Sequence, residues 1–142
     1  MGWTHYWERE KELPANEFKR AVSDCKKIIE LLDISLAGPD GSGQPVFAND
    51  EIVFNGVASS NCEPFVFRRM QPPRPGRNIV LEYCKTEHLP YDLAVQCCLV
   101  ILKYRLNDLI MITSDGSEED WSQAKQVCSD SIGIDNMPTI LS

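Results

Sequence analysis

The sequence has no apolar run that approaches the roughly 20 residues needed to cross a bilayer. Its first residues also have neither the basic start nor the apolar stretch of a signal peptide. We therefore expect a protein that stays in the cytoplasm and does not enter membranes. Basic residues are scarce too, since 14 lysines and arginines stand against 21 aspartates and glutamates, for a net charge of −7. That charge repels polyanions, so nonspecific nucleic-acid binding is not expected.

Metal-binding patterns are missing as well. No Cys-x-x-Cys pair occurs, and the closest Cys/His pairing, Cys84 with His88, has no two further ligands at a matching spacing. The six cysteines fall mostly on apolar positions of predicted helices and strands, which indicates reduced thiols. We expect no metal and no cofactor.

A phosphate-binding loop is only partly present. Residues 38–43 contain three glycines and a proline, which is turn chemistry that could cradle a phosphate. No Gly-Lys-Ser/Thr ending follows, and no helix pattern begins at residue 43. We interpret the segment as a connecting loop.

The remaining pattern is typical of one α+β domain. Hydrophobic residues make up 43% of the 142 residues, an ordinary globular composition at the usual size of one domain. Helical periodicity covers residues 14–32, 90–106 and 117–128. Strand patterns cover residues 2–10, 51–54, 62–68, 79–83 and 109–113. We predict a single domain, residues 1–142, with an antiparallel or mixed sheet of about five to six strands and about three helices packed mainly on one face.

Two short segments combine aromatic surface with polar groups, as small-molecule pockets do. The first is the run Trp3-Thr4-His5-Tyr6-Trp7 on the first predicted strand. Side chains alternate along a strand, so Trp3, His5 and Trp7 share one face, while Thr4 and Tyr6 share the other. Only one set can line a given pocket, and the sequence leaves open which.

The second segment leads into the helix predicted over residues 90–106. It comprises Cys84, Lys85, Thr86, Tyr91 and Asp92. The start of a helix presents unpaired amides and a partial positive charge, so an anion could bind there with help from Lys85 and Thr86. Asp92 could instead satisfy those amides itself as an ordinary residue of the first turn.

Four arginines surround a proline-rich stretch. They are Arg68, Arg69, Arg74 and Arg77, and the prolines between them exclude regular structure. The cluster could bind an anionic ligand, but we interpret these residues as solubility charges on an exposed loop.

Several motifs carry a resemblance that spans nearly the whole chain. They are Trp3-Thr4-His5-Tyr6-Trp7, Asn55-Gly56, Cys84-Lys85-Thr86, Pro90-Tyr91-Asp92, and the Ser114-Asp115-Gly116 turn before an acidic helix that contains a tryptophan. Together they resemble a family of small uncharacterised proteins of bacteria and their phages. The resemblance implies no reaction or ligand, but it favours a phage origin and one shared design for the two segments.

We expect a non-catalytic protein that binds a small, flat, anionic or nucleotide-like ligand. Rings of the first strand would stack on the ligand, while Lys85, Thr86 and Arg69 would contact its anionic group. In a phage protein, this activity would sequester a nucleotide-derived immune signal in the host cytoplasm.

Alternatives stay open. One is a thiol-dependent or acid/base enzyme with Cys84 as nucleophile and Asp92 as the orienting residue. Its base would be His5 or His88. Another is an acidic protein-interaction module that inhibits a host protein. A homo-oligomer is also compatible with an aromatic-rich first strand at a sheet edge or interface.

Overall fold

The computed structural model describes residues 2–142. The described residues form three α-helices and two antiparallel sheets, which confirms the predicted α+β class. The elements in chain order are β1 (Thr4–Arg9), α1 (Ala15–Leu31), β2 (Leu36–Ala37), β3 (Val46–Ala48), β4 (Glu51–Gly56), β5 (Phe65–Arg68), β6 (Val80–Lys85), α2 (Asp92–Leu106), β7 (Ile110–Ser114) and α3 (Ser122–Ile132).

The strands form two antiparallel sheets. In the first, β1 lies between β6 and β7, so the chain's first strand is central. In the second, β4 pairs with β2, β3 and β5. β4 and β5 are antiparallel neighbours in this second sheet. The short strands β2 and β3 were not predicted, because two or three residues are too few to show a periodic pattern.

All three predicted helices are present, and their environments follow from their sequences. α1 buries one stripe that includes Phe18, Cys25 and Ile28, and its other face is exposed. α2 has apolar residues around most of its circumference because it packs against α1, α3 and β7. Ser117 and Asp120 form a capping box on a short 3₁₀ turn that leads into α3.

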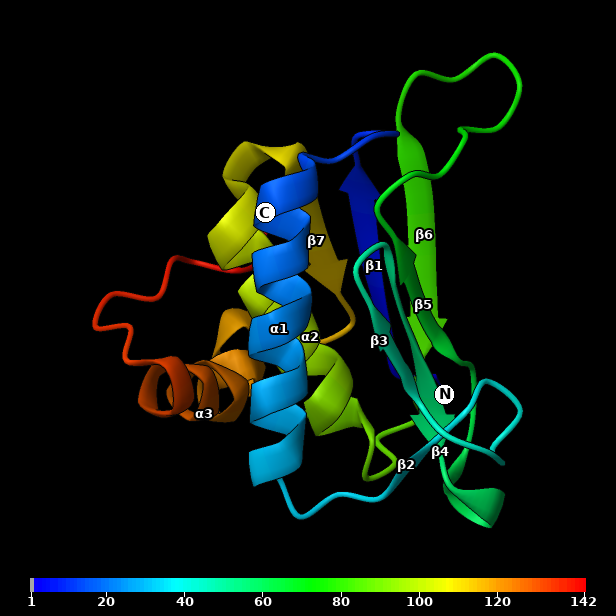
Figure 1. The fold of residues 1–142 in the computed structure, drawn as a ribbon, viewed down its shortest axis with the longest axis vertical. Helices are drawn as coiled ribbons and strands as arrows, with labels where there is room; N and C mark the ends of the chain where they lie inside the picture. Colours follow the sequence, from blue (N-terminus) through cyan, green and yellow to red (C-terminus); the bar gives the residue numbers. More distant parts are fainter. Residues whose placement is uncertain (1) are drawn as a thin grey trace.

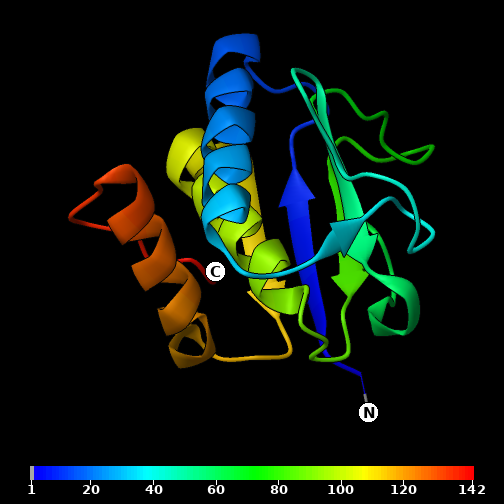
Figure 2. The same cartoon turned by 60° about the horizontal axis from the view of Figure 1, so that its bottom comes forward.

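The helices lie on one side of the strands in both overall views (Figures 1 and 2). No helix covers the other face of the β6–β1–β7 sheet in these views. Large side chains there are exposed, among them Tyr6, Leu81, Tyr83 and Met111. The connection from β5 to β6 projects beyond the body of the protein next to this sheet (Figure 1). The fold therefore leaves one sheet face and one long loop available for contacts.

Among residues 2–142, no helix has both the length and the apolar character needed to span a membrane.

Candidate functional site

β1 carries the first predicted ligand segment and lies directly beside β6, which carries the second. In their antiparallel register, Thr4 is opposite Lys85 and His5 is opposite Cys84. The Thr86 N–H continues the pairing by donating to the Trp3 carbonyl at 3.0 Å. The structure thus brings these two segments together.

A hydrogen-bond network lies under the inward face of β1, centred on the fully buried side chain of His5. Nε2 of His5 is 2.7 Å from Asp92 Oδ1, and Nδ1 is 2.7 Å from Ser114 Oγ. The Thr86 hydroxyl donates to the same Asp92 oxygen at 2.5 Å. The Gly116 N–H donates to Ser114 Oγ at 3.0 Å. The network therefore ties β1, the ends of β6 and β7, and the first turn of α2 together.

The direction of these bonds follows from the acceptor-only character of an ionised carboxylate. His5 Nε2 carries the proton donated to Asp92, so in the neutral ring Nδ1 accepts from the Ser114 hydroxyl. Burial, the largest single influence, raises the pKa of Asp92. The hydrogen bond and charge interaction with His5 and the hydrogen bond from Thr86 together outweigh it and hold that pKa below its ordinary value. Asp92 is consequently ionised at neutral pH and orients the His5 ring.

Aromatic rings close around this network. The Trp3 ring stacks on His88 with centroids 3.9 Å apart, and Trp121 lies 4.9 Å from His5. A Cβ on Gly116 would be 2.6 Å from the Trp3 ring, so this ring lies directly against the turn after β7. Trp3 is near enough to Asp92 to help lower its pKa, although its buried Nε1 has no acceptor in hydrogen-bonding geometry. The main cavities in residues 2–142 have other linings, so the network is a packed interior.

Cys84 and Tyr91 have structural partners. Cys84 Sγ donates to the Glu63 carbonyl at 3.5 Å, and the Tyr91 hydroxyl donates to the same carbonyl at 2.6 Å. Burial raises the pKa of both groups. A nucleophilic thiol needs the opposite shift, so Cys84 lacks the property on which the thiol-enzyme alternative depends.

Trp7 and Arg69 lie outside the network. Trp7 packs in the core against Phe65 and Phe67. Arg69 follows β5 near the far end of β1, and its guanidinium donates to the Leu13 carbonyl at 3.0 Å. Neither residue joins the group formed by His5, Thr86 and Asp92.

The outward side of the sheet presents a different set of residues. Tyr6 and Tyr83 are opposite each other, with ring centroids 6.3 Å apart and exposures of 37% and 58%. Thr4 also points outward, but it is buried beside Asp115, which accepts its N–H at 2.9 Å. We call this surface the open face; it comprises Tyr6, Leu81, Tyr83, Lys85 and Met111.

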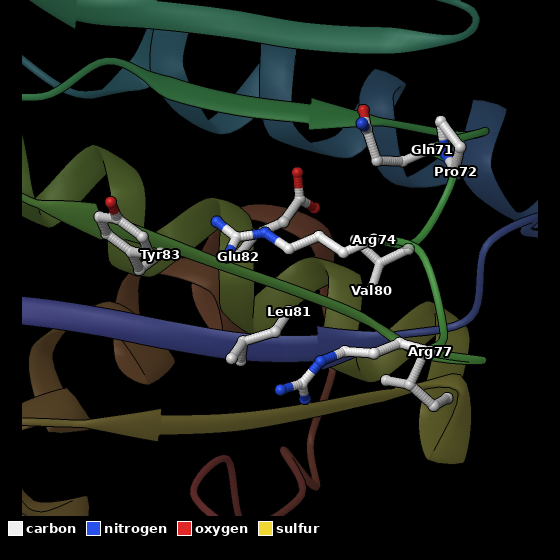
Figure 3. A pocket seen from close by; sticks show the side chains of 9 residues that line it. Gln71, Pro72, Arg74, Arg77, Val80, Leu81, Glu82 and Tyr83 are labelled. Carbon is white, nitrogen blue, oxygen red and sulfur yellow. The ribbon is translucent and has the colours of Figure 1, made fainter.

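A cavity of about 330 Å³ borders the open face. It lies between β6 and the loop that follows β5 (Figure 3), and we call it the β6 groove. Its lining consists of Gln71, Pro72, Arg74, Arg77, Ile79, Val80, Leu81, Glu82 and Tyr83. In Figure 3 the Arg74 side chain extends toward Glu82, and the Arg77 side chain lies alongside Leu81. Both arginines are exposed, and neither forms an ion pair within residues 2–142.

The free edge of β6 forms one wall of this groove. In the register with β1, the peptide groups of alternate residues face β1, and those of Leu81, Tyr83 and Lys85 face away. Lys85 is satisfied by Glu63, which accepts its N–H at 2.8 Å and donates to its carbonyl at 3.0 Å. No strand within residues 2–142 pairs with this edge at Leu81 and Tyr83. The groove thus offers peptide donors and acceptors besides its side chains.

A buried ion pair lies beneath the groove. Arg9 is 1% exposed, and its guanidinium is 3.7 Å from Glu82 Oε1. The same oxygen accepts from the Trp7 indole N–H at 3.2 Å. Burial raises the pKa of Glu82 against the opposing influence of Arg9, and burial lowers the pKa of Arg9. Shifted ionisable groups next to a cavity are a recognised feature of functional sites.

Tyr83 and Glu82 were not expected from the sequence to be site residues. Ser114 was noted only as part of a turn, and Arg74 and Arg77 were interpreted as solubility charges. One signal was available for Glu82, because a carboxylate in the middle of an apolar strand requires a partner or a purpose. The groove itself had no signal in the sequence, since it depends on how the loop after β5 folds against β6.

Comparisons of the chain with protein-family models, with curated proteins and with solved structures found no match, so function rests on this geometry.

Proposed function

We propose that this protein binds a small, flat, anionic ligand of the nucleotide class, without catalysis, in the β6 groove. The observation that carries the proposal is the convergence of two unpaired arginines and an exposed tyrosine on one cavity of about 330 Å³. That volume lies at the lower end of the range of small-ligand sites, roughly 300–1,000 Å³. It suits a mononucleotide better than a larger molecule.

Each part of the groove has a chemical counterpart in such a ligand. The forked guanidinium groups of Arg74 and Arg77 match a pair of phosphate oxygens or a pair of acceptors on the edge of a base. Tyr83 offers a ring face on which a base can stack, and Tyr6 extends that aromatic surface. From the sequence, Lys85, Thr86 and Arg69 were expected to contact the anion. In the present proposal that role belongs to Arg74 and Arg77, which come from the same arginine cluster as Arg69.

Replacing both groove arginines should weaken nucleotide binding at least about tenfold, because two charge-assisted contacts are removed. The variant is Arg74→Gln/Arg77→Gln, and the measurement is isothermal titration calorimetry after a thermal-shift screen of nucleotides and cyclic dinucleotides. Arg20→Gln is the matched control, since Arg20 is exposed on α1 with only Glu17 as partner. Equal affinities for the parent protein and the double variant would contradict the proposal.

A second candidate function is nucleophilic chemistry at Ser114. The chain from Ser114 through His5 to Asp92, with both bonds at 2.7 Å, has the order of a nucleophile, a base and an orienting carboxylate. Ser114 contacts Nδ1 of the ring, whereas the usual triad places the serine on Nε2. Ser114 itself is partly exposed.

A fluorophosphonate reagent tests this second candidate. Attack by Ser114 Oγ would form an oxygen–phosphorus bond and release fluoride, while His5 takes the serine proton. Labelling should then disappear in Ser114→Ala and in His5→Gln, as read by intact-protein mass spectrometry. Absence of any adduct on the folded parent protein would remove this candidate and leave the binding proposal untouched.

A further inference from the structure

We infer that the β6 groove selects a guanine base over an adenine base. The inference rests on the proposed nucleotide binding and specifies which base of the nucleotide the groove recognises. Its basis is the pairing of an acceptor, Glu82, with a donor, Arg74, in one cavity. In Figure 3 the Arg74 side chain runs beside Glu82 along this cavity.

Glu82 is held ready to accept hydrogen bonds. Its Oε1 is engaged by the Trp7 indole and lies near Arg9, which fixes the direction of the carboxylate. No hydrogen bond occupies Oε2 within residues 2–142, and 21% of the side chain is exposed. A fixed carboxylate with one free oxygen at a cavity wall is an acceptor for a ligand donor.

A guanine base presents two adjacent donors, N1–H and the 2-amino group, beside the acceptors O6 and N7. The free oxygen of Glu82, Oε2, has two lone pairs and can accept from both donors. The guanidinium of Arg74 can take O6 and N7, the commonest specific contact of arginine with guanine. Arg77 is then left for the phosphate.

Adenine fits the same groups poorly. Its N1 is an acceptor, and it would direct a lone pair at the carboxylate of Glu82. Its 6-amino group is a donor, and it would face the guanidinium of Arg74, which has no acceptor. Binding adenine would leave polar groups of the site unpaired, which is the strongest source of discrimination among similar ligands. The free peptide groups of Leu81 and Tyr83 present both donors and acceptors, so they do not reverse this preference.

A ligand series on the unmodified protein tests the inference without a risk of misfolding. Calorimetric titrations would use guanosine, inosine and adenosine monophosphate. We expect guanosine monophosphate to bind at least about tenfold more tightly than adenosine monophosphate. Inosine monophosphate, which lacks the 2-amino donor, should lie between them. Equal or tighter binding of adenosine monophosphate would overturn the inference.

The outcomes separate the two proposals. If none of the three nucleotides binds, the proposed nucleotide binding itself fails. If all three bind equally and lose affinity together in Arg74→Gln/Arg77→Gln, nucleotide binding stands and base selection is overturned. Glu82→Gln adds a direct check, because its amide can place an N–H against guanine. In this variant, the affinity for guanosine monophosphate should fall to that for adenosine monophosphate, which itself should not weaken.

Discussion

Replacing Arg9 by methionine should lower the free energy of unfolding by about 3–5 kcal/mol. Arg9 is buried, and its guanidinium donates to three carbonyls, those of Glu10, Arg68 and Arg69. The last two bonds join β1 of one sheet to the end of β5 in the other. Methionine fills similar space without donors, so the carbonyls lose their partners and the carboxylate of Glu82 loses its counter-charge. Urea denaturation followed by circular dichroism measures the change.

Two further variants make this test specific. Arg20→Met alters an exposed arginine and should change stability by no more than about 0.5 kcal/mol. Arg9→Met/Glu82→Leu replaces the buried pair by apolar groups and should recover part of the loss, since no unpaired carboxylate remains. A loss below about 1 kcal/mol for Arg9→Met would mean that the two sheets are held together by other contacts.

Arg9 also illustrates what sequence reasoning could not reach. Periodicity located β1, α1, β4, β5, β6, α2 and β7, because each has a long enough apolar pattern. It did not show that the final residue of β1 would be a buried arginine, since such burial depends on carbonyls about 60 positions further along the chain. Arg9 lies on the inward face of β1 with His5 and Trp7, as the alternation of side chains requires. In the sequence alone, a charged residue at an inward position with no recognisable partner contradicts the usual burial of apolar residues.

The candidate site, too, could be predicted from the sequence only in part. The sequence predicted that the segment Trp3–Trp7 and the segment that leads into α2 would share one site, and the register of β1 with β6 places the two segments side by side. It left open which face of β1 would take part. It did not predict Ser114 as the second partner of His5, because the pairing of β7 with β1 is not encoded locally. The expected pocket is filled by packed rings, and the open cavity lies on the other side of β6.

We therefore assign different roles to the two sides of the sheet: the inward network stabilises the fold, and the groove binds the ligand. The inward network fixes the ends of β1, β6 and β7 relative to α2, and it uses the polar residues that the sequence made conspicuous. The open face and the β6 groove use residues that are ordinary in type, namely tyrosine, leucine and arginine, and that become a site only through their arrangement. Variants of the network should therefore act on stability, and variants of the groove on affinity.

Replacing Asp92 by alanine should lower the free energy of unfolding by about 2–4 kcal/mol, because buried donors on His5 and Thr86 lose their common acceptor. Asp92→Asn keeps an acceptor oxygen and should lose roughly half as much. Chemical denaturation at neutral pH measures both. Equal losses for the two variants would contradict a role for Asp92 as a charged acceptor.

The pH dependence of this stabilisation has a definite sign. The folded state holds the pKa of Asp92 below its ordinary value of 3.8, so the folded state favours the carboxylate. The resulting stabilisation is fully present above that ordinary value and is lost as the pH falls through the lower pKa of the folded state. The difference in unfolding free energy between the parent protein and Asp92→Asn should thus still be present at about pH 5 and shrink below about pH 4. A difference that grows on acidification would show that burial, which opposes ionisation, governs Asp92 instead of its hydrogen bonds to His5 and Thr86.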